Sequence, residues 1–216
     1  MQFLAVRGIN RTIQLLLLFL FLFNAAATFY MPILAVFITA SIANARLSTV
    51  GIALAIYAIV KSVFQLPLAK WLDRRPGEKS DFLMLLTGSV LATLYAFGYL
   101  FISTVPHLYV LQIMSGIADA CIFAAYYAIF SHHIDKESQG FEWSLFSVGG
   151  LTVSAAIGAL IGGFVAENFG FRVLFISVGI IDAIATLLLI LLYPLLKILR
   201  AQYHYKTISH KRESPK

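Results

Sequence analysis

Three ionisable residues lie deep inside long apolar stretches of the sequence: Lys61, Asp119 and Asp182. A charge in a hydrocarbon environment costs free energy unless it is paired or hydrated, so such residues are candidates for function. Lys61 and Asp119 carry opposite charges and could pair, bind a polar solute or relay a proton. Asp182, with Thr186 one helical turn further on, we interpret as a packing or partner contact.

Polar residues recur around Lys61 and Asp119 at helical spacing, and residues at i, i+3, i+4 and i+7 share one face of a helix. The three faces defined in this way contain Tyr57, Lys61 and Gln65; Gln112, Ser115 and Asp119; and Asn24 and Thr28. We hypothesise that these faces line a common water-filled cavity that binds a solute or relays a proton. The alternative is a structural polar contact inside a helix bundle. For Asn24 this alternative is favoured, because amides commonly join membrane helices.

The elements that must position these residues follow from the composition. Of the 216 residues, 60% are hydrophobic and 12% are charged, which is more apolar surface than a soluble domain of this size can bury. A membrane-spanning helix needs about 20 predominantly apolar residues. The segments that qualify are 12–40, 47–70, 82–103, 107–131, 143–166 and 171–196. The sequence therefore predicts an all-α membrane protein with six transmembrane helices in residues 1–196. The first segment is long enough either to tilt or to contain an irregular turn, which Pro32 could supply.

Positive residues are distributed unevenly between the two ends of these segments. Most Lys and Arg residues fall in the N-terminal stretch, in alternate loops and in the tail 197–216, whereas the opposite ends carry Arg46 and Arg172. Because Lys and Arg concentrate on the cytoplasmic side, we expect a multi-pass protein of a plasma or inner membrane with both termini in the cytoplasm. The net charge of +6 then reflects orientation rather than nucleic-acid binding. The basic tail is expected to be a disordered cytoplasmic segment or linker.

The densest block of charge stands between the second and third apolar segments, in residues 68–81. Pro76-Gly77 forms a turn among the charged residues Lys70, Asp73, Arg74, Arg75, Glu78, Lys79 and Asp81. This block resembles the signature loop between the second and third helices of the major facilitator superfamily. It departs from the family pattern in three ways: Ala69 stands where Gly is usual, Arg75-Pro76 replaces a single residue, and Glu78 stands where a basic residue is usual.

A second resemblance lies in the fifth apolar segment. Its run Gly158-Ala-Leu-Ile-Gly162-Gly163 is similar to a Gly-Pro-x-x-Gly-Gly run on the family's fifth helix, with Ala159 in place of Pro. Small residues spaced four apart let helix backbones approach closely, so helix packing explains these glycines equally well. Gln112 stands where the family's proton-coupled antiporters tend to carry Arg. This departure and the missing Pro weaken the case for drug/proton antiport.

The resemblance covers nearly the whole chain and implies a half bundle of six helices built as a 3+3 inverted repeat. It also implies alternating access, in which two six-helix bundles rock about a solute site at mid-membrane. The charged loop, through Asp73 and Arg74 with Gly77 and Lys79, would form part of the cytoplasmic gate. We expect the chain to be the N-terminal half of a longer transporter, or a short chain that pairs with itself or with another six-helix chain.

Three classes of function follow, and a secondary-active solute transporter is favoured. Its partners would be a small solute, a coupling proton or ion, the lipid bilayer and a second six-helix half or homodimer partner. A non-transporting membrane scaffold or partner-binding subunit is the alternative. An enzyme is least favoured, because only His132, His133 and Asp135 come close to a cluster of catalytic or metal-binding groups. Adjacent histidines point in different directions on a helix, so we interpret both as solvated loop residues and expect neither a metal site nor a cofactor.

Overall fold

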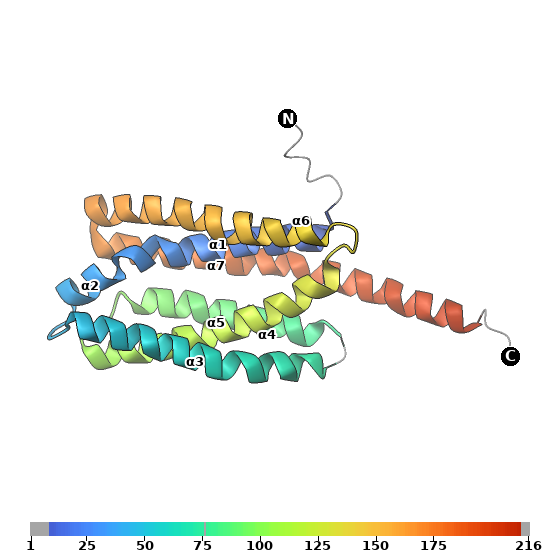
Figure 1. Cartoon of the computed structure of the whole chain (residues 1–216), viewed down its shortest axis with the longest axis horizontal. Helices are drawn as coiled ribbons and strands as arrows, with labels where there is room; N and C mark the ends of the chain where they lie inside the picture. Colours follow the sequence, from blue (N-terminus) through green and yellow to red (C-terminus); the bar gives the residue numbers. More distant parts are fainter. Residues whose placement is uncertain (1–8, 76, 213–216) are drawn as a thin grey trace, which may run out of the picture.

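The chain folds into a bundle of long helices that lie roughly parallel or antiparallel to one another (Figure 1). The structure, a computed structural model, describes residues 9–75 and 77–212, and side chains up to residue 194. In chain order the elements are α1 (Arg11–Tyr30), η1 (Met31–Ile33), α2 (Leu34–Ser41), α3 (Leu47–Asp73), α4 (Lys79–Gly98), α5 (Val105–His133), α6 (Gln139–Ser144), η2 (Leu145–Val153) and α7 (Ser154–Arg212). No strand occurs among the described residues, so the all-α prediction is confirmed for that part of the chain.

Five helical segments of the described chain are long and apolar enough to cross a membrane: Arg11–Ser41, Leu47–Asp73, Lys79–Gly98, Val105–His133 and Gln139–Pro194. The first four coincide with predicted segments to within a few residues. The fifth is 56 residues long and contains both of the last two predicted segments. Gly170 interrupts its helical geometry with φ 78° and ψ 172°, a conformation that glycine reaches without a Cβ clash. In Figure 1 α7 doubles back on itself in its orange part.

The first span contains an irregular turn at Pro32. Proline has no backbone N–H and clashes with the carbonyl four residues earlier. The α-helix therefore ends at Tyr30, and the 3-10 turn Met31–Ile33 joins it to α2. The irregular turn is one of the two possibilities that the sequence left open for this long segment.

The start of helix α1 and the last residues of helix α7 lie at the same end of the bundle (Figure 1). The loop between α3 and α4 lies at that end as well. Helix α7 extends to Arg212 and so includes most of the tail 197–216. The division of the chain into a bundle and a disordered tail stays a prediction.

The core lies where α1, α4, α5 and α7 meet. Helix α1 packs along α7, α5 lies against both α3 and α4, and α4 also contacts α7. Aromatic rings fill the space between α1, α4 and α7, where Tyr99 and Phe175 stack with ring centroids 4.6 Å apart. Helix α3 is different, since few of its side chains are buried and it joins the bundle mainly through α5. The contact between α3 and α5 therefore decides where the polar residues of α3 lie.

Glycine allows the first part of α7 to approach α1 closely. A Cβ at Gly158 would collide with the carbonyl oxygen of Ala25, and a Cβ at Gly162 would collide with that of Phe29. Gly163 differs from these two, because a Cβ there would meet nothing within 4 Å. Successive residues of a helix are about 100° apart around its axis, so Gly163 faces away from α1. Of the predicted packing glycines, two lie in this helix contact and one does not.

Candidate functional site

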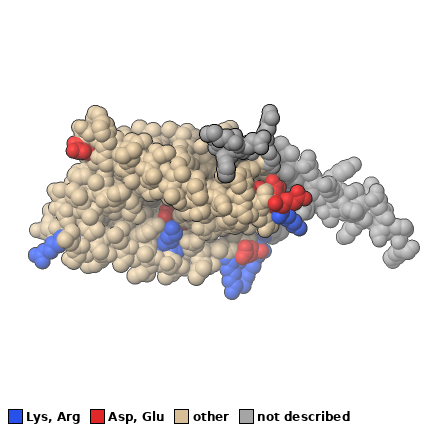
Figure 2. All heavy atoms as spheres, turned by 45° about the horizontal axis from the view of Figure 1, so that its top comes forward, with Lys and Arg blue, Asp and Glu red and all other residues tan. Residues whose placement is uncertain are grey.

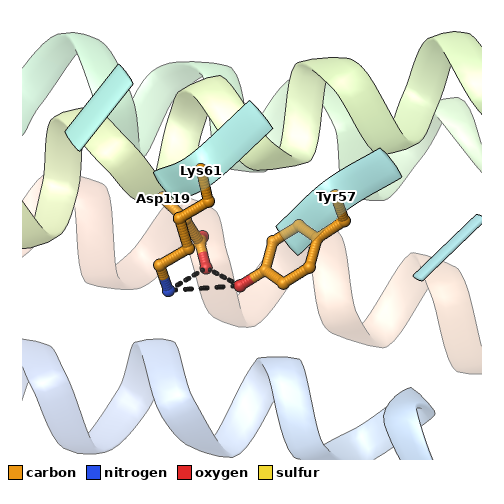
Figure 3. A network of polar contacts seen from close by, with 3 residues as sticks. All are labelled: Tyr57, Lys61 and Asp119. Atoms are coloured by element: carbon orange, nitrogen blue, oxygen red, sulfur yellow. Dashed lines mark hydrogen bonds and ion pairs between the residues drawn. The ribbon is translucent and has the colours of Figure 1, made fainter. Parts of the chain in front are cut away.

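Lys61, Asp119 and Tyr57 form a closed triangle of polar contacts between α3 and α5 (Figure 3). The Lys61 ammonium donates to Asp119 Oδ2 and to the Tyr57 hydroxyl oxygen, each at 3.2 Å. The Tyr57 hydroxyl donates to the same Asp119 oxygen at 2.5 Å. Lys61 and Asp119 each stand near the midpoint of their helix. The triangle therefore lies far from the charged ends of the bundle.

The two charges of the pair are unequally accessible. The side chain of Lys61 is 26% exposed and that of Asp119 is 11% exposed. The Lys61 ammonium also lies over the ring of Phe123, 4.1 Å from its centroid, and a desolvated contact of this kind stabilises the cation. Each charge is thus compensated, which a largely buried charge requires. An incoming group would meet the ammonium before the carboxylate.

Gly116 sets the distance between the two helices beside this triangle. A Cβ at Gly116 would come within 2.9 Å of the Tyr57 carbonyl oxygen and of Val60 Cβ. A heavy-atom contact that short requires one helix to move. Because Gly116 has no Cβ, α3 lies close enough to α5 for Tyr57 and Lys61 to reach Asp119. Spacing alone placed Gly116 on the Asp119 face, at i−3, but its steric role depends on which helix lies opposite.

The structure brings Tyr57, Lys61 and Asp119 together, which is one of the possibilities that the sequence left open, but it places the amides of Gln112 and Asn24 elsewhere. Gln112 is buried and donates to the Tyr99 hydroxyl at 2.9 Å, at the contact with the end of α4. Asn24 donates to the Leu151 carbonyl and to Ser154 Oγ.

These two amides therefore join helices instead of meeting Lys61. For Asn24 this is the favoured alternative stated above. Gln65 follows Lys61 by one turn on α3 and is half-buried. It makes no hydrogen bond within the described part of the chain, so its amide remains available beside the triangle.

Charge elsewhere gathers at the ends of the helices. Figure 2 shows Lys, Arg, Asp and Glu side chains at both ends of the visible surface, with a small charged group in the middle of an otherwise uncharged face. A bundle with apolar sides and charged ends matches the apolar core and the polar surfaces of a bilayer. Long apolar side chains are exposed along α3 and along the first part of α7, including Leu66 and Leu160.

Comparison with known protein families supplies the identification. The family model described as Major Facilitator Superfamily matches residues 16–204. The chain belongs to the major facilitator superfamily. A search of curated proteins gives no match to it. Members of this superfamily are membrane transporters, so the apolar helices of the chain are those of an integral, multi-pass membrane protein.

The loop that carries the superfamily resemblance joins α3 to α4. Asp73, Arg74, Gly77 and Lys79 are all exposed, and Gly77 has φ 88°, which glycine adopts without strain. Arg75 stacks over the Trp71 ring at 4.5 Å. Within the described residues, no ion pair involves Asp73, Arg74 or Lys79. These charges are therefore open to a partner outside the described chain.

One histidine of the predicted loop is not solvated. His133 is buried at the end of α5, and its Nε2 lies 3.4 Å from Glu78 Oε1. Its Nδ1 lies 2.9 Å from the Ile129 carbonyl oxygen. The interpretation of both histidines as solvated loop residues is therefore wrong for His133, because α5 extends two residues beyond the predicted end, Ser131, and turns this ring inward.

Asp182 lies in α7, one turn before a residue that meets α4. It is buried, and its Oδ1 has no hydrogen-bond partner among the described residues. Its carbonyl oxygen accepts from Thr186, whose hydroxyl also lies 3.3 Å from that of Thr93 on α4. This position within a helix contact fits the predicted packing role.

Proposed function

We propose that the chain is a secondary-active solute transporter, or one half of such a transporter, and that Lys61 and Asp119 form its solute and ion site. The observation that carries the proposal is an ion pair near the midpoint of two spans, joined by a tyrosine hydroxyl and reachable at its ammonium. An ion pair inside a membrane bundle is costly to maintain. A bundle that needed only stability would be served as well by apolar side chains.

The proposed membrane arrangement has six spans. The reversal at Gly170 divides the fifth apolar segment into two arms, each long enough to cross a bilayer, so the crossing number becomes even. The charged loop between α3 and α4, the start of α1 and the end of α7 then all lie on the cytoplasmic side, where Lys and Arg residues concentrate. The 3+3 repeat and a second six-helix unit, from a homodimer partner or another half, complete the proposal.

The exposed loop between α3 and α4 is the proposed cytoplasmic gate. Alternating access needs contacts that form in one state and break in the other. Asp73 and Arg74 have charges without ion-pair partners in the described chain. In one state the Asp73 carboxylate would contact a helix end of the second half; at a helix N-terminus such a contact contributes about 0.3–1 kcal/mol when exposed. That is enough to change the ratio of two states several-fold. Gly77 would form the turn of the same loop, and Lys79 would add a positive charge to it.

Uptake and efflux of a panel of labelled organic anions, cations and sugars test the proposal in cells that express the full chain. Cells without the chain give the baseline. We expect saturable flux of at least one solute, and loss of that flux in Asp119→Asn. Lys136→Met, a charge removal in an exposed loop, is the matched control and should leave the flux unchanged. Equal flux with and without the chain would reject transport and favour the non-transporting scaffold.

A further inference from the structure

The Lys61 ammonium retains unused binding capacity. An ammonium has three N–H donors. In the described structure two acceptors lie within hydrogen-bond distance of it, Asp119 Oδ2 and the Tyr57 hydroxyl. One donor is therefore left for a ligand, and the side chain is the more exposed member of the ion pair. Asp119 is the deeper member and already accepts from both neighbours.

Aromatic rings continue from Lys61 toward the surface. The Phe123 ring lies beneath the ammonium, 4.1 Å from Nζ to its centroid. The Tyr127 ring follows at 5.7 Å between centroids and is 38% exposed. Phe23 of α1 meets Phe123 edge-on at 6.3 Å. Phe23 is buried and the ammonium covers a face of Phe123, so Tyr127 is the exposed ring that a flat ligand at Lys61 would contact.

Building on the proposed transport function, we propose that this site binds small organic anions, namely a carboxylate attached to an aromatic body. The carboxylate accepts the free N–H of Lys61, and the ring packs on the exposed Tyr127. The amide of Gln65, one turn along the same face, can donate to the second carboxylate oxygen. A cationic solute fits less well, because it would have to displace Lys61 from the less exposed Asp119. A sugar fits less well too, since it needs many polar partners and the side chains next to Lys61 on α5 are aromatic.

Equilibrium binding to the full chain in detergent tests this inference, with labelled benzoate as the probe. We expect saturable benzoate binding that unlabelled benzoate displaces and that benzylamine, of the same shape and opposite charge, does not. Acetate, which lacks the ring, should compete at least about tenfold more weakly. Benzylamine competing as well as benzoate would overturn the proposal, as would an absence of saturable benzoate binding.

Variants separate charge from shape in the same assay. Lys61→Met should weaken benzoate binding by about tenfold or more, whereas Lys61→Arg, which keeps the charge, should stay within a few-fold of the native chain. Asp119→Asn, which removes the neighbouring negative charge and leaves Lys61 in place, should still bind benzoate. Retention of full affinity in Lys61→Met, or loss of benzoate binding in Asp119→Asn, would overturn the proposal.

A failure of the benzoate-binding proposal can be distinguished from a failure of the proposed transport function. The binding experiment involves no membrane gradient and no flux. Benzoate binding without flux of any solute would support the ligand class and reject transport. Flux of a cation or sugar without benzoate binding would support transport and reject the ligand class.

Discussion

Removing only the positive charge of the Lys61–Asp119 pair should destabilise the protein more than removing both charges. In Lys61→Met the Asp119 carboxylate keeps the Tyr57 hydrogen bond but loses its counter-charge, while its side chain stays 11% exposed. In the double variant Lys61→Met/Asp119→Asn no charge remains. The amide oxygen can still accept from Tyr57. The second substitution should therefore recover part of the stability that the first one loses.

The magnitude follows from burial. Breaking a fully buried ion pair by removing one partner costs about 3–5 kcal/mol. This pair is partly exposed at Lys61, so we expect about 2–3 kcal/mol for Lys61→Met and about 1 kcal/mol for the double variant. For a chain of this length, 1 kcal/mol corresponds to about 2–4 °C in the unfolding midpoint. The midpoint should fall by about 4–12 °C in the single variant and by about 2–4 °C in the double variant.

Cys121 provides the assay. It is the single cysteine of the chain and is buried on α5, two residues beyond Asp119. A maleimide dye that becomes fluorescent on reaction therefore reports the opening of this helix during heating in detergent. Additive losses, with the double variant less stable than Lys61→Met, would refute the direct pairing of the two charges.

Three further predictions concern helix contacts and the gate. Gly116→Ala should separate α3 from α5 and lower both the solute flux and the unfolding midpoint. The control is Gly51→Ala on α3, which should lower neither, because a Cβ at Gly51 would meet nothing within 4 Å. Equal effects of the two variants would contradict the steric role of Gly116. Gly162→Val should lower the unfolding midpoint strongly and Gly163→Val only slightly, since only the first Cβ would strike α1; equal midpoints would contradict this contact. Asp73→Asn should slow flux at matched protein levels, because it removes a charge of the proposed gate, and unchanged flux would reject that role.

The sequence predicted the helices well because apolar length is a local property. The spans and the turn at Pro32 follow from composition and from the missing N–H of proline. The sequence also named Lys61 and Asp119 as a possible pair, because both charges lie deep in apolar segments, but spacing within each helix does not show which faces meet. A pair of opposite charges inside an apolar bundle has few alternative partners.

Other features depend on how each helix is rotated and on what lies opposite, which spacing does not determine. Gln112 shares a face with Asp119 in the spacing pattern, yet its amide donates to the hydroxyl of Tyr99, the residue that follows α4. Phe123 lies at i+4 from Asp119, so a search of that face for aromatic residues would have found it. The reversal at Gly170 depends on the positive φ of that one residue. The residue type alone does not reveal the reversal, because glycine is also common where helices pack closely.

The most direct test of the account is solute flux through membranes that contain equal amounts of folded Lys61→Met, Lys61→Arg and native chain, with folding checked by Cys121 labelling. The account predicts that Lys61→Met abolishes saturable flux and that Lys61→Arg retains a measurable part of it. Native flux in Lys61→Met would contradict the claim that this ammonium is the working group of the transporter.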